Sequence, residues 1–381
     1  MSPFWAVAHL PALLFTSHQA QLCLYPLFVV AFGLLVSQLY QVARQTELKQ
    51  GSPPLPLFWI AVLATFLTSR FLVRDMTECG VNLMLVAGSW FAFVRWQSGH
   101  DRTAGITLGI LTALKCTPAL FIAWFLWKRQ WKVVTTASIT ICLCMLTPLF
   151  WMKPALYIET MHYWGLTLFT GMGTADPSQG VLGVEPLQNM SLKPAIGRFL
   201  MHLPAGHVAR MDHPYYIDFL NLGPVWSGRI AWMVLGGLMF FLLTRVPRQV
   251  EDRSANQLAW EYVLGGVLIL LYSPITWGQH CVGLFPLFFL LGHRCLIRKQ
   301  SSPAILGVVT FYVLINLVLN RGLVGKDWTW LIDSYHLPTF SILLFVPLVL
   351  RCHKEECSRS ISTESYEADL RLPTEAQPEA A

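Results

Sequence analysis

The sequence predicts an all-α integral membrane protein, a multi-span helical bundle with about ten membrane segments. Hydrophobic residues make up 54% of the 381 residues and charged residues only 13%, and the mean hydropathy is +0.50, far from the balance of a soluble domain. The 15 Trp and 23 Phe suit interfacial belts and lipid-facing helices. Despite the net charge of +6, the basic residues lie mainly in short loops between apolar runs, which indicates membrane topology and not nucleic-acid binding.

The expected membrane segments follow from the apolar runs, and the basic loops give their orientation. Taking Lys128–Lys132 as cytoplasmic places the other Lys- and Arg-rich loops on the same side, so the C-terminus is expected to be cytoplasmic. Some runs are shorter than the roughly 20 residues that a helical span needs. The runs are Gln21–Tyr40, Leu55–Val73, Val81–Trp96, Ala104–Trp127, Val133–Met152, Ile230–Leu243, Trp260–Tyr272, Cys281–Leu291, Pro303–Leu319 and Leu337–Leu350.

A lysine lies inside one of these runs: Lys115 occupies the middle of Ala104–Trp127, with Pro118 close behind it. A charge at the bilayer centre costs about 2.5–3.5 kcal/mol on insertion scales and rarely occurs without a partner or a purpose. Because basic clusters flank the run on both sides, both of its ends are expected on the cytoplasmic face. The run therefore predicts a re-entrant hairpin whose tip places Lys115 in an anion-binding cavity reached from the outer side. The alternative is a snorkelling lysine on one kinked helix.

The chain is expected to form one membrane domain, residues 1–352, followed by an acidic tail. Residues 353–381 scatter acidic residues among Ser, Thr and Pro, which predicts a disordered cytoplasmic segment. Residues 153–229 form a large outer loop, and a loop of this length is usually functional. Within it, Ser191–Leu203 has apolar residues near helical spacing with Lys193 and Arg198 on the other side. This stretch is expected to lie on the outer leaflet, either meeting lipid phosphates or serving as a plain surface anchor.

Four segments resemble, in order, motifs of glycosyltransferase family 87, polyprenyl-phosphate-sugar-dependent membrane proteins of the GT-C superfamily. Val81-Asn82-Leu83-Met84 resembles the start of a family span, and Ala104–Trp131 resembles the family's run containing Lys and Pro. Asn189-Met190-Ser191-Leu192 and Ser273–His280 resemble two further signatures of the family. The resemblance extends from near the first residue to about residue 351.

The resemblance implies a fold of GT-C type. It also implies an activity, the transfer of a hexose, with mannose expected, from a polyprenyl-phosphate donor to a lipid or glycan acceptor on the outer face of a bacterial inner membrane. No cofactor is implied, because the lipid-linked sugar is itself the cosubstrate. The expected partners are this donor, the acceptor and membrane lipids, with no nucleic acid.

Such a transferase needs cations or hydrogen-bond donors on the departing phosphate, where negative charge develops. Arg suits bidentate contact with a phosphate, and Lys acts as a point charge. His280 is expected to hydrogen-bond the phosphate, the donor sugar or the acceptor, or else to be a structural histidine at the interface. Asn82 is expected to orient the hairpin or the substrate, or to pack between helices. The expected substrate-binding residues are Arg70, Arg74, Asn82, Lys115, Asn189, Ser191, Lys193 and Trp277.

A carboxylate is also needed to take the proton of the acceptor hydroxyl. Family members usually carry this Asp in the first outer loop, and the present chain resembles the family only after that loop and the span before it. Glu78 and Asp75 are the substitute catalytic residues by position, together with His280, and Asp75 is also a natural ion-pair partner for Arg74. No cluster of His, Asp and Glu at ligand spacing predicts a metal site.

The sequence leaves two other functions open. A transporter or flippase of polyprenyl-linked lipid would share the broken hairpin and the intramembrane lysine, although no internal repeat is visible. A catalytically inactive protein that binds the lipid carrier is the second alternative, and the absent first loop favours it.

Overall fold

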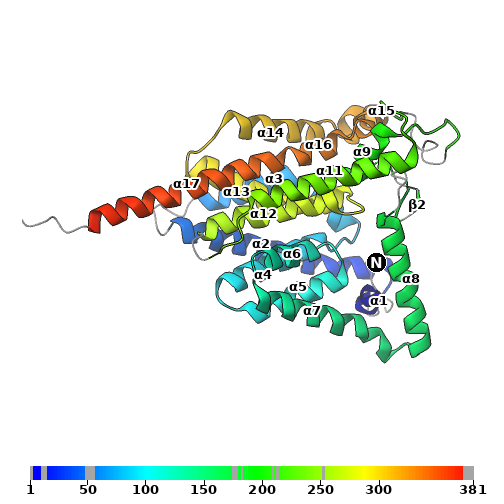
Figure 1. Ribbon diagram of the computed structural model, residues 1–381, viewed down its shortest axis with the longest axis horizontal. Coiled ribbons are helices and arrows are strands. Elements are labelled where there is room, and N and C mark those ends of the chain that lie inside the picture. Colours follow the sequence, from blue (N-terminus) through cyan, green and yellow to red (C-terminus); the bar gives the residue numbers. More distant parts are fainter. Residues whose placement is uncertain are drawn as a thin grey trace, which may run out of the picture.

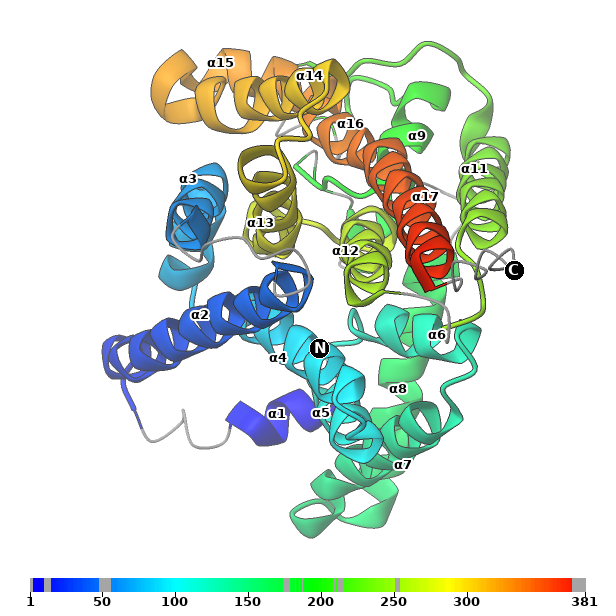
Figure 2. The ribbon, with the colours of Figure 1, turned by 90° about the vertical axis from the view of Figure 1, so that its left-hand side faces the viewer.

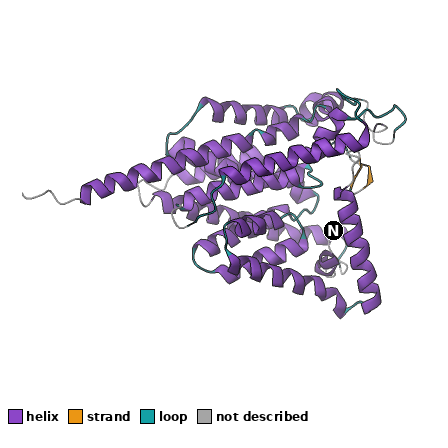
Figure 3. Cartoon of the chain, viewed as in Figure 1, coloured by secondary structure: helices purple, strands orange, loops and turns teal. Residues whose placement is uncertain are grey.

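The computed structural model describes residues 3–9, 15–47, 56–173, 179–181, 183–184, 186, 188–207, 210, 215–250 and 254–371. Over these residues the protein is helical apart from one short strand pair (Figure 3). Strands β1 (Gln179–Gly180) and β2 (Gly183–Val184) pair antiparallel. The long helices lie side by side in one bundle, and the C-terminal helix extends beyond it at one end (Figure 1). The all-α prediction is confirmed.

The helices follow the predicted apolar runs in order. The first half of the chain forms α1 (Pro3–His9), α2 (Ser17–Glu47), α3 (Pro56–Thr77), α4 (Asn82–Gln97), α5 (Asp101–Leu114), α6 (Ala119–Trp127), α7 (Trp131–Leu146), η2 (Thr147–Phe150) and α8 (Pro154–Gly173). The second half forms α9 (Leu192–Leu200), α11 (Gly223–Arg245), α12 (Ala255–Tyr272), η3 (Gly278–Leu284), α13 (Phe285–Gly292), η4 (His293–Ile297), α14 (Pro303–Val313), η5 (Leu314–Val318), α15 (Arg321–Ser334), α16 (Leu337–Leu343) and α17 (Phe345–Arg371).

Within the described residues, 6 segments are long and apolar enough to cross a membrane, which makes the protein an integral membrane protein. They are Gln21–Arg44, Leu57–Thr77, Trp131–Phe150, Gly223–Arg245, Gly278–Ile297 and Leu337–Ser358. The bent pair Pro303–Val318 and Arg321–Ser334, at 104°, gives a seventh if it counts as one broken span or re-entrant loop. The expectation of about ten was therefore too high. The remaining runs form α4, α5 with α6, and α12. These segments are helical, but each is too short or too polar to count as a full membrane span.

Helices α5 and α6 form a hairpin. At its tip, Lys115 contacts Asn82, the first residue of α4. At its foot, Trp96 near the end of α4 donates a hydrogen bond from Nε1 to Gln130 Oε1, 3.1 Å away, three residues beyond α6. If α5 and α6 were one kinked helix, the chain would leave it at the end of the bundle opposite to where it entered. Instead, the chain enters and leaves at the same end, beside the end of α4 (Figure 1).

The core of the bundle is built around α12 and α13. Helix α12 is buried along most of its length, and every residue of α13 is buried. Figure 2, which looks along the bundle, shows α12 between α13, α17 and α6. Tyr262 of α12 stacks on Phe121 of the hairpin, with ring centroids 4.1 Å apart, and its hydroxyl donates to the carbonyl of Ser89 at 2.8 Å. Helix α12 therefore fixes both the hairpin and α4.

The expected outer loop and the start of the expected tail both contain helices. Residues 153–229 begin with α8, which runs across the direction of the bundle helices (Figure 1). Helix α9 lies within the stretch Ser191–Leu203, for which the apolar spacing predicted a helix, and it packs against α11 with Leu192 and Ala195 buried. The backbone is also helical across residue 353, where we expected a disordered tail to begin, because His353 and Glu356 are buried against the bundle. The last part of that expected tail, residues 372–381, lies outside the described residues.

Candidate functional site

The break between α5 and α6 places Lys115 at the hairpin tip. Helix α5 ends at Leu114, and Lys115 is extended, with φ −146° and ψ 127°. Pro118 follows in the turn, and a proline disfavours helical geometry at the residue before it and removes a backbone donor. Helix α6 then starts again at Ala119, whose N–H donates to the carbonyl of Cys116 at 3.1 Å. The interruption that the sequence predicted therefore has a local cause in the Thr117-Pro118 step.

A chain of hydrogen bonds holds the lysine. Lys115 Nζ donates to Asn82 Oδ1 at 2.7 Å, and Asn82 Nδ2 donates to Asp75 Oδ1 at 2.6 Å. The other carboxylate oxygen of Asp75 accepts the N–H of Leu83 at 2.9 Å. Since only the amide oxygen of Asn82 can face an ammonium group and only its NH₂ can face a carboxylate, its orientation is fixed. Asn82 thus connects Asp75 to Lys115 at the hairpin tip through two hydrogen bonds.

Asp75 is an orienting residue in this arrangement. Its side chain is 0% exposed and both carboxylate oxygens accept hydrogen bonds from α4, so it is not open to an acceptor as a general base would be. It also does not pair with Arg74, as we expected from the sequence. Arg74 Nε instead donates to Glu78 Oε1 at 2.7 Å, one turn along on the surface. An i, i+4 pair satisfies Arg74 locally, which frees Asp75 to turn toward α4.

Gly80 makes the close approach of Asp75 possible. Its N–H donates to the carbonyl of Asp75 at 2.6 Å, and a Cβ added at Gly80 would lie 1.8 Å from Asp75 Oδ1. No side chain fits there unless the carboxylate moves. A glycine at this position is therefore a requirement of the Asp75–Asn82–Lys115 chain.

The substitution Gly80→Ala is expected to displace the Asp75 carboxylate and to lower the free energy of unfolding by about 1–3 kcal/mol, because the added methyl overpacks the turn. Thermal unfolding in detergent measures this. Gly33→Ala is the matched control, since a Cβ at Gly33 in α2 meets nothing within 4 Å and alanine favours a helix. Equal unfolding temperatures for the two variants would contradict the close contact.

A narrow cavity lies between the hairpin tip, α4, α12 and the segment 273–286. Polar residues line it where α4 begins and α12 ends: Asn82, Lys115, Ser273, Thr276 and His280. Farther along α4 and α12 the lining is aromatic, with Trp90, Phe121 and Tyr262. The cavity is therefore amphipathic, and it suits a ligand with an anionic head and an apolar chain.

His280 presents a donor at the polar end of this cavity. Its Nδ1 accepts the backbone N–H of Trp277 at 2.9 Å, so the neutral ring carries its proton on Nε2. The Trp277 and His280 rings are parallel to within 6°, with centroids 6.3 Å apart. Lys115 and Arg74 are both near enough to act electrostatically on His280. Two nearby positive charges and an N–H donor thus favour an anion at this point.

A second, charged cleft adjoins the first cavity. Its lining includes Arg70, Arg74, Glu78, Trp277 and Asp333. Trp277 lines the cleft while its stacking partner His280 lines the cavity, so this ring pair lies between the two spaces. Arg70 Nη1 donates to the carbonyl of Asn316 at 2.7 Å, which fixes the guanidinium on the cleft wall.

The sequence did not single out Asp333. It lies on α15, in the stretch between the expected runs Pro303–Leu319 and Leu337–Leu350. The available signal was an acidic residue among the aromatic residues of Trp328–Tyr335, which is unusual for a loop that only connects two spans.

Three residues expected to bind substrate line neither space. Asn189 Nδ2 donates to the carbonyl of Pro274 at 2.9 Å, and its Oδ1 accepts the N–H of Thr276 at 2.8 Å. Ser191 donates to the same Oδ1 at 2.9 Å. Both side chains are buried, and they hold the turn that leads to His280. Lys193 Nζ lies 5.2 Å from the ring centroid of Trp232 on α11, a cation–π contact away from the cavity.

The described part of the chain contains no group of three or more His, Cys, Asp or Glu that could hold a metal ion.

The fold and the cavity define a polytopic membrane protein with an amphipathic cavity, whose polar end is lined by Lys115 and His280. The sequence pattern of glycosyltransferase family 87 matches residues 2–274. This match covers more than half of the chain, and the protein belongs to glycosyltransferase family 87. The family resemblance inferred from the sequence motifs is therefore confirmed over residues 2–274.

One curated relative is similar to most of the chain. It is the polyprenol-phosphate-mannose-dependent alpha-(1-2)-phosphatidylinositol pentamannoside mannosyltransferase of Mycolicibacterium smegmatis, 25% identical over 309 residues. The aligned part covers 74% of the present chain and 62% of the relative, so the chain spans less than two thirds of that protein's length. No solved structure matches the chain.

Proposed function

We propose that this protein transfers a hexose, with mannose as the expected sugar, from a polyprenyl-phosphate donor to a lipid or glycan acceptor. The observation that carries the proposal is the convergence of Lys115 and His280 on the polar end of an amphipathic cavity. A polyprenyl-phosphate sugar has the matching chemistry, an anionic phosphate between a sugar and a long apolar chain. The mycobacterial relative is named for its dependence on such a donor.

In this proposal Lys115 and His280 act on the donor phosphate. Negative charge grows on this phosphate as its bond to the sugar C1 breaks, and donors fixed in place beforehand stabilise that charge most. Asn82 and Asp75 fix the ammonium of Lys115, and the Trp277 N–H fixes the ring of His280. The polyprenyl chain would pack against the aromatic lining formed by Trp90, Phe121 and Tyr262.

The acceptor is proposed to approach from the charged cleft. Glu78 lies in that cleft beside Arg74, and its carboxylate is the proposed base that takes the proton of the acceptor hydroxyl. Attack on C1 from the side opposite the phosphate would invert the configuration of the sugar. Arg70 and Arg74 suit an acceptor that carries a phosphate, because guanidinium groups bind phosphate oxygens in pairs.

The proposed location is a bacterial inner membrane, with transfer on its outer face and the C-terminus in the cytoplasm. The basic loops support this orientation, because Lys128, Arg129 and Lys132 lie at the hairpin foot, opposite the tip that carries Lys115.

A transfer assay in membranes tests the proposal. Membranes that contain the protein receive radiolabelled polyprenyl-phosphate-mannose and the lipids of the host, and labelled products are separated from the donor. We expect a labelled lipid or glycan that is absent from membranes without the protein. Donor that is bound or moved across the bilayer without any transfer would instead support the flippase or the inactive carrier-binding protein.

A further inference from the structure

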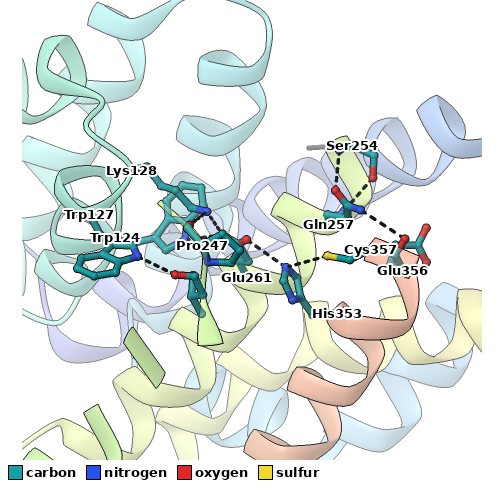
Figure 4. A network of polar contacts seen from close by, with 11 residues as sticks. Trp124, Trp127, Lys128, Pro247, Ser254, Gln257, Glu261, His353, Glu356 and Cys357 are labelled. Carbon is teal, nitrogen blue, oxygen red and sulfur yellow. Dashed lines mark hydrogen bonds and ion pairs between the residues drawn. The ribbon is translucent and has the colours of Figure 1, made fainter. Parts of the chain in front are cut away.

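We infer that Lys128, Glu261 and His353 are positioning residues, through which helix α17 holds both walls of the donor cavity in place. The inference rests on the proposed function, because Lys115 and His280 need accurate placement only if they act on a donor. The network lies at the foot of the hairpin, away from the cavity, and Figure 4 shows it. None of these residues lines the cavity or the charged cleft.

One face of α6 attaches the hairpin to α12. Phe121, Trp124 and Lys128 lie on this face at helical spacing. Phe121 stacks on Tyr262, Trp124 Nε1 donates to Glu261 Oε2 at 3.3 Å, and Lys128 Nζ lies 2.5 Å from the same oxygen. The Lys128 and Glu261 side chains are 0% and 1% exposed, so this ion pair is shielded from water and ions.

Glu261 connects the hairpin to the C-terminal helix. While its Oε2 contacts α6, its Oε1 lies 3.1 Å from His353 Nε2 on α17 (Figure 4). One turn earlier on α12, Gln257 Nε2 donates to the carbonyl of Glu356 at 3.3 Å. A single buried carboxylate is therefore shared between α6 and α17, and α12 contacts α17 at two successive turns.

The same stretch of α17 also holds the span that carries His280. Arg298 Nη1 donates to both carboxylate oxygens of Glu356 at 2.7 Å, and Arg294 pairs with Glu355. Both arginines lie at the end of the segment Gly278–Ile297 that is opposite His280. Helix α17 thus binds the foot of the hairpin, through Glu261, and the foot of the span that carries His280.

Because α6 is short and rigid, contacts at its foot determine where the hairpin tip with Lys115 lies. Helix α6 has 9 residues and is about 14 Å long, so a tilt of about 10° at its foot displaces the tip by about 2 Å. A misplacement of about 1 Å in a catalytic group can reduce the rate about 100-fold. Buried ion pairs are weak sources of net stability, and fixing one arrangement among several is a role that they can serve.

The double substitution Lys128→Met with Glu261→Leu tests the inference, because it removes the contact between α6 and α12 without leaving Lys128 or Glu261 as an unpaired buried charge. We expect the dissociation constant of polyprenyl-phosphate-mannose to rise about 10-fold and the rate of transfer to fall about 100-fold, at an unfolding temperature close to that of the wild type. The free thiol of Cys116 beside Lys115 is exposed, and it reports the position of the tip. Its alkylation rate, followed by mass spectrometry of the peptide, is expected to change severalfold.

Two further variants complete the test. His353→Leu cuts the link to α17 and leaves the Lys128–Glu261 pair intact, so a smaller change in the same direction is expected even if the double variant folds poorly. Arg351→Gln breaks an exposed pair with Glu355 on the same helix and serves as the control without effect. Unchanged Cys116 alkylation and donor binding in the double variant and in His353→Leu would overturn the inference. If the variants alter Cys116 alkylation but the wild-type protein binds no donor, the positioning role is supported and the proposed function is refuted.

Discussion

The substitution Lys115→Met is expected to reduce transfer from polyprenyl-phosphate-mannose about 100- to 1,000-fold, the usual effect of removing one donor from a preorganised anion site. The ammonium group of Lys115 is a positive charge at the polar end of the cavity. Methionine keeps the length and the apolar stem of the side chain but cannot bind a phosphate. The Asn82–Asp75 contact persists without the lysine, so the protein is expected to fold normally. Single-turnover transfer at equal expression gives the rate.

Lys132→Met is the matched control for that experiment. Lys132 is an exposed lysine at the start of α7, at the hairpin foot, and its loss is expected to leave transfer unchanged. Binding of the donor by the Lys115 variant with wild-type affinity would refute the anion site at the hairpin tip.

The substitution Glu261→Gln is expected to destabilise the protein by about 3–5 kcal/mol, because it leaves the Lys128 ammonium as an uncompensated buried charge. Lys128 Nζ keeps one neutral acceptor, the carbonyl of Pro247 at 2.6 Å, which cannot replace the carboxylate. Titration with a denaturing detergent, followed by tryptophan fluorescence, measures the change in the free energy of unfolding.

Two comparisons separate this effect from a general loss of contacts. The double variant Lys128→Met with Glu261→Leu is expected to recover most of the stability, since it removes both charges. Arg351→Gln, at an exposed pair, is expected to change stability by less than about 1 kcal/mol. A Glu261→Gln protein as stable as the double variant would mean that the buried pair is not the source of the effect.

The sequence predicted the parts of this structure that depend on local rules. Basic residues on both sides of Ala104–Trp127, with Pro118 inside the run, indicated the hairpin and the position of Lys115 at its tip. The order of the helices followed from the apolar runs. Residues spread over the chain, including Asn82, Lys115 and His280, were assigned to one region, and the structure brings them to one cavity.

The pairings between distant residues were not predictable in this way. From the sequence, Arg74 could pair either with the adjacent Asp75 or with Glu78 one helical turn later. The close turn at Gly80 lets Asp75 face α4, and Arg74 pairs with Glu78. Asn189 and Ser191 were expected to bind substrate, yet they hold the Pro274–Thr276 turn from within. Such contacts depend on the packing of segments about 85 residues apart, which periodicity does not encode.

Glu261 was overlooked, although the rule that singled out Lys115 applies to it equally. It lies inside the apolar run Trp260–Tyr272, and a carboxylate in a membrane segment usually has a partner and a purpose. The matching lysine, Lys128, was interpreted only as a marker of the cytoplasmic side. Pairing each intramembrane charge with an opposite charge at the same depth would have suggested the network at the hairpin foot.

Photo-crosslinking tests the central claim, that the cavity between α4, α12 and the hairpin holds the lipid-linked donor. A polyprenyl-phosphate-mannose with a diazirine in its first isoprene units is bound to the purified protein, irradiated, and the labelled peptides are identified by mass spectrometry. We predict labelling of peptides that contain Trp90, Phe121 or Tyr262, which line the cavity, and suppression by excess unlabelled donor. Labelling confined to the lipid-facing helices α7 and α11, unaffected by competitor, would contradict the account.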